Sequence, residues 1–129
     1  MIKRLKIILS VLIIQSLVVS FSYSEEKEVK GKEITILDLR EITHAVAGWF
    51  VVVHGTSKTQ VEALASSVEK ETATQLDEKP WGKQGLRNGE WAILDYSDIV
   101  VHVFHEEARQ RYALEELWGD ANIETLEEV

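Results

Sequence analysis

Cysteine is absent from the 129 residues of this chain. Thiol chemistry, iron–sulfur clusters and cysteine-bound zinc are therefore excluded. The sequence also has no internal repeat and no phosphate-binding glycine-rich loop of either common type. With 45% hydrophobic residues, a chain of this length can bury the core of one domain without a disulfide or a structural metal.

Positive charge is scarce. The chain has 14 basic and 22 acidic residues, and three of the basic ones, Lys3, Arg4 and Lys6, lie in the first 24 positions. Residues 25–129 therefore hold 11 basic against 22 acidic residues, a net charge of −11. A surface this acidic repels phosphate backbones and attracts basic proteins. The charge predicts little or no direct nucleic-acid contact and a partner with a basic protein surface.

The first 24 residues have the pattern of an export signal. A basic start is followed by an apolar stretch at 7–19 and by the small residues Ser22 and Ser24 at the two positions that a signal peptidase reads, which is the order of a secretory signal peptide. The apolar stretch is short for a membrane span and is diluted by serines and a glutamine. Three interpretations remain open for this segment: a signal peptide, a short membrane anchor, or a hydrophobic first helix behind a misassigned start.

The pattern beyond this segment predicts a mixed β-sheet flanked by helices, an α/β (α+β) domain at residues 25–121. We expect strands at 34–39 and 49–53, the second covered on both faces. A helix capped by Ser57 and Gln60 should run to about Leu76. A hairpin of strands at 90–94 and 99–104 should follow, then a last helix from Glu106 to Trp118. From Asn122 to the end the sequence predicts an acidic tail.

Catalytic patterns are weak. His102 and His105 are three apart on a predicted strand, so they point to opposite faces and cannot share a metal. His44 and His54 have no flanking ligands, so no metal site and no cofactor is expected. Asp95 and Asp98 flank the predicted hairpin turn, where aspartates cap backbone amides. The chain is therefore predicted not to be an enzyme.

One segment resembles part of an enzyme fold. Gly55-Thr56-Ser57 lies between a predicted strand and a predicted helix and is similar to the glycine-serine turn of nucleotidyltransferases. That family also requires two carboxylates, one residue apart on a following strand, to hold two metal ions. The nearest acidic pair, Glu69 and Glu71, falls within a helix, which separates the two side chains by about 200°. We expect a nucleotidyltransferase-like topology without the catalytic carboxylates.

An ordered series of residues begins with WAILDYSDIVVHVF at 91–104 and continues with Arg109, Tyr112, Leu114-Glu115 and LWGDA at 117–121. This series resembles the ribosomal silencing factors of the RsfS/Iojap family. Shorter stretches support the resemblance: LDLR at 37–40, GTS at 55–57, QV at 60–61 and KPW at 79–81. The resemblance covers roughly residues 30–121. Gly48-Trp49, His54 and the signal-like first segment depart from the family's usual pattern.

The resemblance implies a cytoplasmic protein that binds the fourteenth ribosomal protein of the large subunit. Bound there, such a protein prevents the small subunit from joining and represses translation, typically during starvation. Aromatic residues anchor protein interfaces, and the hairpin combines them with acids. We therefore expect the partner-binding residues to be Trp91, Asp95, Tyr96, Asp98, His102, Tyr112 and Trp118.

Rival hypotheses follow from the features that the family leaves unexplained. If residues 1–24 direct export or anchoring, the chain is a secreted or membrane-tethered protein-binding domain; otherwise no membrane contact is expected. A metal-dependent nucleotidyltransferase is the second rival. The sequence leaves open whether the chain forms a homodimer in the absence of the partner.

Overall fold

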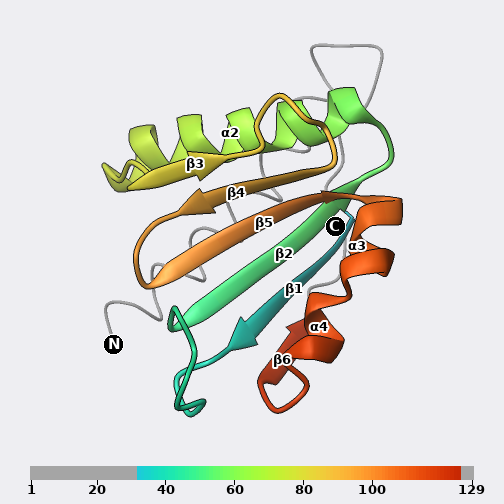
Figure 1. Ribbon diagram of the computed structural model, residues 1–129. Helices are drawn as coiled ribbons and strands as arrows, with labels where there is room; N and C mark the ends of the chain where they lie inside the picture. The colour runs from blue at the N-terminus through green and yellow to red at the C-terminus, as the bar shows by residue number, and fades with distance from the viewer. Residues whose placement is uncertain (1–31, 126–129) are drawn as a thin grey trace.

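The computed structural model describes residues 32–125, which form one six-stranded β-sheet with helices on both of its faces (Figure 1). In chain order the elements are β1 (Lys32–Asp38), β2 (Trp49–Gly55), α2 (Lys58–Leu76), β3 (Gly82–Gln84), β4 (Trp91–Asp95), β5 (Ile99–His105), α3 (Glu106–Tyr112), α4 (Leu114–Leu117) and β6 (Asn122–Thr125). The predicted mixed sheet flanked by helices is confirmed.

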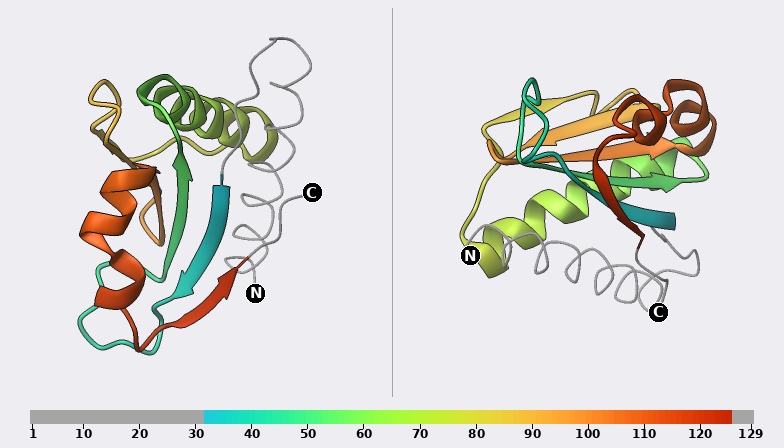
Figure 2. Two further views of the ribbon diagram at one scale, coloured as in Figure 1. Left: turned by 90° about the vertical axis from the view of Figure 1, so that its right-hand side faces the viewer. Right: turned by 90° about the horizontal axis from the view of Figure 1, so that it is seen from below.

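The strands are ordered β3-β4-β5-β2-β1-β6 across the sheet. The central pair, β2 and β5, is parallel, with Trp49 opposite Ile99 and Gly55 opposite His105, and all other pairs are antiparallel. Because β2 and β5 run in the same direction, both end at the same edge of the sheet. α2 and α3 therefore both begin at that edge, on opposite faces of the sheet (Figures 1 and 2).

Both faces of the central strands are buried. Every residue of β2 and all but the last of β5 are buried, as predicted from their continuous apolar runs. Val51 and Val101 point to one face, where Leu64 of α2 packs. Phe50 and Phe104 point to the other face, which α3 and α4 cover (Figure 2). Because successive strand residues point to opposite faces of the sheet, the core consists of two layers, one on each face.

α2 begins and ends as the sequence predicts. Ser57 is its N-cap, and its Oγ accepts from the backbone N–H of Gln60 at 3.1 Å. The Gln60 side chain accepts from the backbone N–H of Thr56 at 2.7 Å. Together these bonds satisfy amides that a helix start leaves without partners. The helix ends at Leu76, where Asp77 adopts the left-handed conformation.

Three elements differ from the prediction. The last helix is broken in two at Ala113, whose φ of 46° ends α3 while its N–H bonds to the carbonyl of Arg109. The predicted acidic tail instead begins with strand β6, which pairs with β1 through backbone groups although all four of its residues are exposed. β3 was not predicted either, and it too is an exposed edge strand. Hydrophobic periodicity cannot reveal strands that bury no side chains.

The signal-like segment at residues 1–24 lies outside the described residues, as does the end of the chain beyond residue 125. Between residues 32 and 125, no helix has the length and hydropathy that crossing a membrane requires.

Candidate protein-docking face

Six aromatic rings gather on the side of the sheet opposite α2. They come from β2, β4, β5, α3 and the end of α4, and we call them the aromatic face: Phe50, Trp91, His102, Phe104, Tyr112 and Trp118. Four of them, Trp91, His102, Tyr112 and Trp118, are among the partner-binding residues expected from the sequence. The fold therefore places the larger part of that set on one surface.

Strand pairing positions the centre of this face. Trp91 lies opposite Phe104 in the β4–β5 pair, and their rings stack with centroids 4.9 Å apart. Tyr112, the last residue of α3, brings its ring to 4.7 Å from Trp91. On the neighbouring strand, Phe50 contacts His102 edge-on at 4.5 Å. Ring pairs at these separations add to the stability that area burial provides.

A hydrogen bond fixes the orientation of Trp91. Its indole Nε1–H donates to Nδ1 of His102 at 3.1 Å. The imidazole is therefore neutral, with its proton on Nε2. Burial lowers the pKa of His102 to about 4, because desolvation disfavours the imidazolium. Within residues 32–125, His102 Nε2 has no hydrogen-bond partner.

The outer part of the aromatic face is open to solvent. Tyr112 is 46% exposed, and Leu117 of α4 is 71% exposed. Because His102 already accepts the indole N–H, the half-buried Trp91 offers a partner only its ring. Arg111 lies over the Tyr112 ring at 5.3 Å and pairs with Glu90. Such a surface can bind apolar groups, and it can hold cations against the ring faces.

The two aspartates lie at the far end of the hairpin from Tyr112. Asp95 Oδ1 accepts from the backbone N–H of Ser97 at 2.8 Å, which is the turn-capping role predicted for it. The backbone carbonyl of Asp98 accepts from the amides of Gly48 and Trp49, both at 2.9 Å. Both residues thus organise the turn.

Tyr96 is separated from the aromatic face by the sheet. Its hydroxyl bonds to Oγ1 of Thr72 on α2 at 2.7 Å, and its ring packs against the α2 layer of the core. Burial raises the pKa of the Tyr96 phenol. The sequence placed Tyr96 with Trp91 because both belong to the hairpin, but Tyr96 continues the alternation of Ala92 and Leu94 and faces α2.

Sequence reasoning missed two residues of this region, Phe50 and Leu117. Phe50 could have been found, because it alternates with Val52 on a strand paired with β5. Leu117 is exposed because the chain turns at Ala113, which the sequence did not reveal.

A buried polar network lies beside the aromatic face. Arg109, only 6% exposed, donates to Glu115 at 2.7 and 3.1 Å and to Thr35 at 3.2 Å. Its Nη1 lies 2.9 Å from His54 Nδ1 and donates to it, since a guanidinium has no acceptor. The network borders an open pocket of about 390 Å³. These hydrogen bonds join separate elements, so Arg109 ties β1, β2 and α4 to α3.

The nucleotidyltransferase-like turn is found where the sequence placed it, between β2 and α2. Glu69 pairs with Lys83, and Glu71 accepts from the Gln75 amide. In the part of the chain that the structure describes, no three histidine or acidic side chains are grouped to hold a metal ion.

Comparisons with known proteins agree on one family. The family described as "Ribosomal silencing factor during starvation" (RsfS) matches residues 21–129. The ribosomal silencing factor RsfS of Bacillus subtilis is 37% identical over 98 residues, which cover 76% of this chain and 81% of the relative. The chloroplastic protein Iojap of Zea mays is 30% identical over 108 residues, covering 79% of this chain and 45% of that longer protein.

Solved structures show the same relationship. A crystal structure of a Chromobacterium violaceum protein superposes with a TM-score of 0.65 at 34% identity and covers 82% of this chain and 83% of its own. One from Bacillus halodurans reaches a TM-score of 0.69 at 27% identity, over 96% and 98% of the two chains. This chain therefore belongs to the ribosomal silencing factor family, RsfS.

Proposed function

We propose that this protein represses translation by binding the fourteenth ribosomal protein of the large subunit and occupying space that the small subunit must enter. The observation that carries the proposal is the aromatic face, with half-buried Trp91 and Trp118 beside exposed Tyr112. Aromatic anchors with partly open rings are typical of protein interfaces. No bond is made or broken, so a regulatory role requires no catalytic residues.

The charge of the chain supports a basic partner. A net charge of −8 speeds encounter with a cationic protein surface at low ionic strength. Lysine or arginine side chains of the partner could lie against the exposed part of the Tyr112 ring and pair with acidic side chains around it. We therefore expect binding to weaken as salt rises, while the aromatic contacts set the residual affinity.

Sedimentation of purified ribosomal subunits tests the proposal. The protein should migrate with large subunits on a sucrose gradient and should reduce the fraction of joined ribosomes. Absence of association with large subunits at low salt would contradict it. Cell fractionation adds a second test, because the proposal requires action in the cytoplasm; an exported, shortened form would instead favour the secreted binding domain.

The docking residues are tested with the isolated ribosomal protein. Trp91→Ala should weaken its binding about 10-fold or more, as expected for an interface anchor. Trp81→Ala is the matched control, because that exposed indole lies at the β3 edge, away from the aromatic face. Equal affinity of both variants would exclude the aromatic face. Light scattering of the protein alone determines whether it is a monomer or a homodimer when free.

A further inference from the structure

One acid-free segment of the described chain holds three basic residues, and it carries the most exposed large hydrophobic residue. Residues 79–89 contain three basic side chains, Lys79, Lys83 and Arg87, and no acidic one. Within them Trp81 is 85% exposed. Tryptophan is seldom this exposed, and neither the fold nor the aromatic face uses it. We call residues 79–89 the basic strip.

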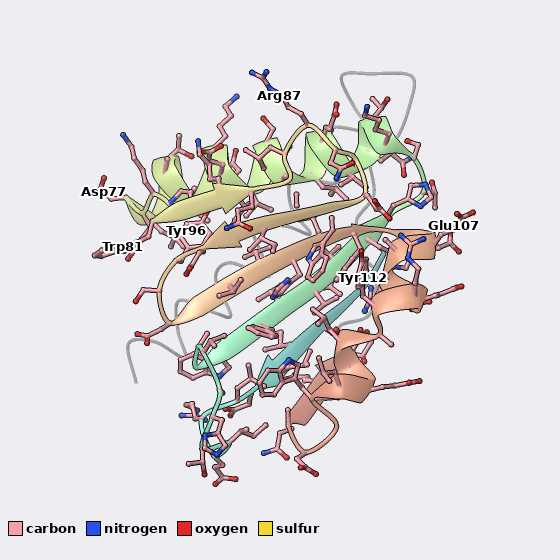
Figure 3. All side chains as sticks on the ribbon, in the orientation of Figure 1. Asp77, Trp81, Arg87, Tyr96, Glu107 and Tyr112 are labelled. Atoms are coloured by element: carbon pink, nitrogen blue, oxygen red, sulfur yellow. The ribbon has the colours of Figure 1, made fainter. Side chains whose placement is uncertain are left out.

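The strip is held in a defined shape along the free edge of the sheet. The backbone N–H of Trp81 donates to the Asp95 carbonyl at 2.6 Å, and β3 pairs with β4. Gly85 and Gly89 have φ of 72° and 71°, which fold the strip back into β4. The backbone is thus ordered on both sides of Trp81 and Arg87, whose side chains project away from the body (Figure 3).

A fourth cation joins the strip from another element. A Cβ added to Gly89 would lie 1.9 Å from Cγ of Lys58, so the stem of Lys58 runs over this glycine. Lys83 is anchored on the inner side by Glu69 at 2.8 Å. Asp77 lies at the Trp81 end of the strip (Figure 3). Because the Lys83 charge is paired with Glu69, the remaining positive charge of the strip lies towards Lys58 and Arg87, with the indole at the other end.

We infer that the basic strip binds single-stranded or looped RNA, with a base stacked on Trp81 and phosphates held by Lys58 and Arg87. Exposed aromatic rings beside ordered cations are what sequence-tolerant single-strand binding requires, because every base has a face that can stack. The overall acidity of the protein disfavours such contact elsewhere. This inference is independent of the docking proposed for the aromatic face.

A second copy of the chain fits this edge less well. Symmetric pairing of β3 with its counterpart would bring two acid-free basic strips together, and like charges opposite each other on paired strands are destabilising. An acidic peptide would satisfy the cations but would leave the indole without a planar partner. RNA is the class of ligand that uses both features.

Fluorescence anisotropy with a labelled 12-nucleotide oligouridylate, at low salt and with the full chain, tests the inference. We expect Trp81→Ala to weaken binding about 10-fold, since stacking contributes about 1–3 kcal/mol per base. Replacing Lys58 and Arg87 with glutamate should abolish it. For wild type, two phosphate contacts predict that log K falls with log salt with a slope of about −1.4. Binding should quench tryptophan emission in wild type and not in Trp81→Ala.

Matched controls separate this site from the docking face. Tyr112→Ala removes a half-exposed ring, and Arg111→Glu reverses one charge, both on the aromatic face; each should retain RNA binding. Strip variants should keep their affinity for the isolated ribosomal protein, so the two proposals fail separately. Wild-type RNA affinity in Trp81→Ala, equal binding of polyglutamate, or a dimer that Trp81→Ala dissociates would each overturn the inference.

Discussion

His102 makes the stability of this protein depend on pH in a defined window. The imidazole is 5% exposed and accepts the Trp91 indole N–H, and burial lowers its pKa from 6.5 to about 4. In the unfolded chain the same group titrates near 6.5. The unfolded state therefore binds more protons between pH 6.5 and pH 4, and the free energy of unfolding falls as pH falls through that range.

The size of this loss of stability follows from the difference between the folded and unfolded pKa of His102. Linkage gives a loss of about 2 kcal/mol at pH 5 relative to pH 8, and about 3 kcal/mol once the pH is below the folded pKa. For a domain with a total stability of roughly 5–15 kcal/mol, that is a large fraction. Urea denaturation followed by tryptophan fluorescence, at half-unit steps from pH 5 to pH 8, measures it.

A non-titrating variant supplies the control. His102→Gln should lower stability at pH 8, but its stability should change less between pH 5 and pH 7 than that of wild type. Proton NMR of the imidazole gives a direct test, because the His102 resonances should not titrate above pH 5. A His102 pKa between 6 and 7 in the folded protein would refute the reasoning.

Four further outcomes are expected. Gly85→Ala should destabilise the fold by about 2 kcal/mol or more, because φ is positive there and an added Cβ would lie 2.0 Å from the Trp91 carbonyl oxygen. Gly82→Ala is the control: an added Cβ there has no atom within 4 Å, so the urea midpoint should change little. Ala113→Gly should raise the melting temperature, because glycine adopts the left-handed conformation without strain, a gain of about 0.5–1 kcal/mol in the free energy of unfolding. A lower melting temperature would contradict a left-handed residue 113. Arg109→Met should lower the free energy of unfolding by about 3 kcal/mol, because it leaves buried partners without their donor. If urea denaturation gave this variant the stability of wild type, the network would not contribute to stability. Trp91→Ala should leave the far-ultraviolet circular dichroism unchanged while weakening ribosomal protein binding, and a loss of helical signal would show that the residue is needed for folding.

The two strands at the edges of the sheet show where sequence patterns fail. β3 and β6 are exposed along their whole length, so neither has the alternation by which a half-buried strand is recognised. Their strand structure depends on backbone groups offered by β4 and β1. The continuous apolar runs of β2 and β5, by contrast, require burial on both faces, and the sequence located both strands correctly.

The candidate site also has some residues that the sequence placed correctly and others that it did not. Alternation along 99–104 already placed His102 and Phe104 on one side of a strand, and the structure confirms it. Tyr96 was grouped with Trp91 because the two are close in the chain, but the alternation of Ala92 and Leu94 continues to Tyr96 and places it on the opposite face. The break at Ala113, which sets the direction of Tyr112 and exposes Leu117, depends on a left-handed backbone conformation that alanine does not signal.

The sequence by itself determined the mixed sheet, the capped helix α2, the hairpin, the charge and the family, because each follows from local periodicity, capping or a long ordered series of residues. Only the tertiary structure decided which rings share a surface, that His102 is buried and neutral, and that Trp81 is left outside beside the cations of the strip. Those properties arise from contacts between segments far apart in the chain. Which side chains are buried depends on how the strands pair, and no single strand determines it.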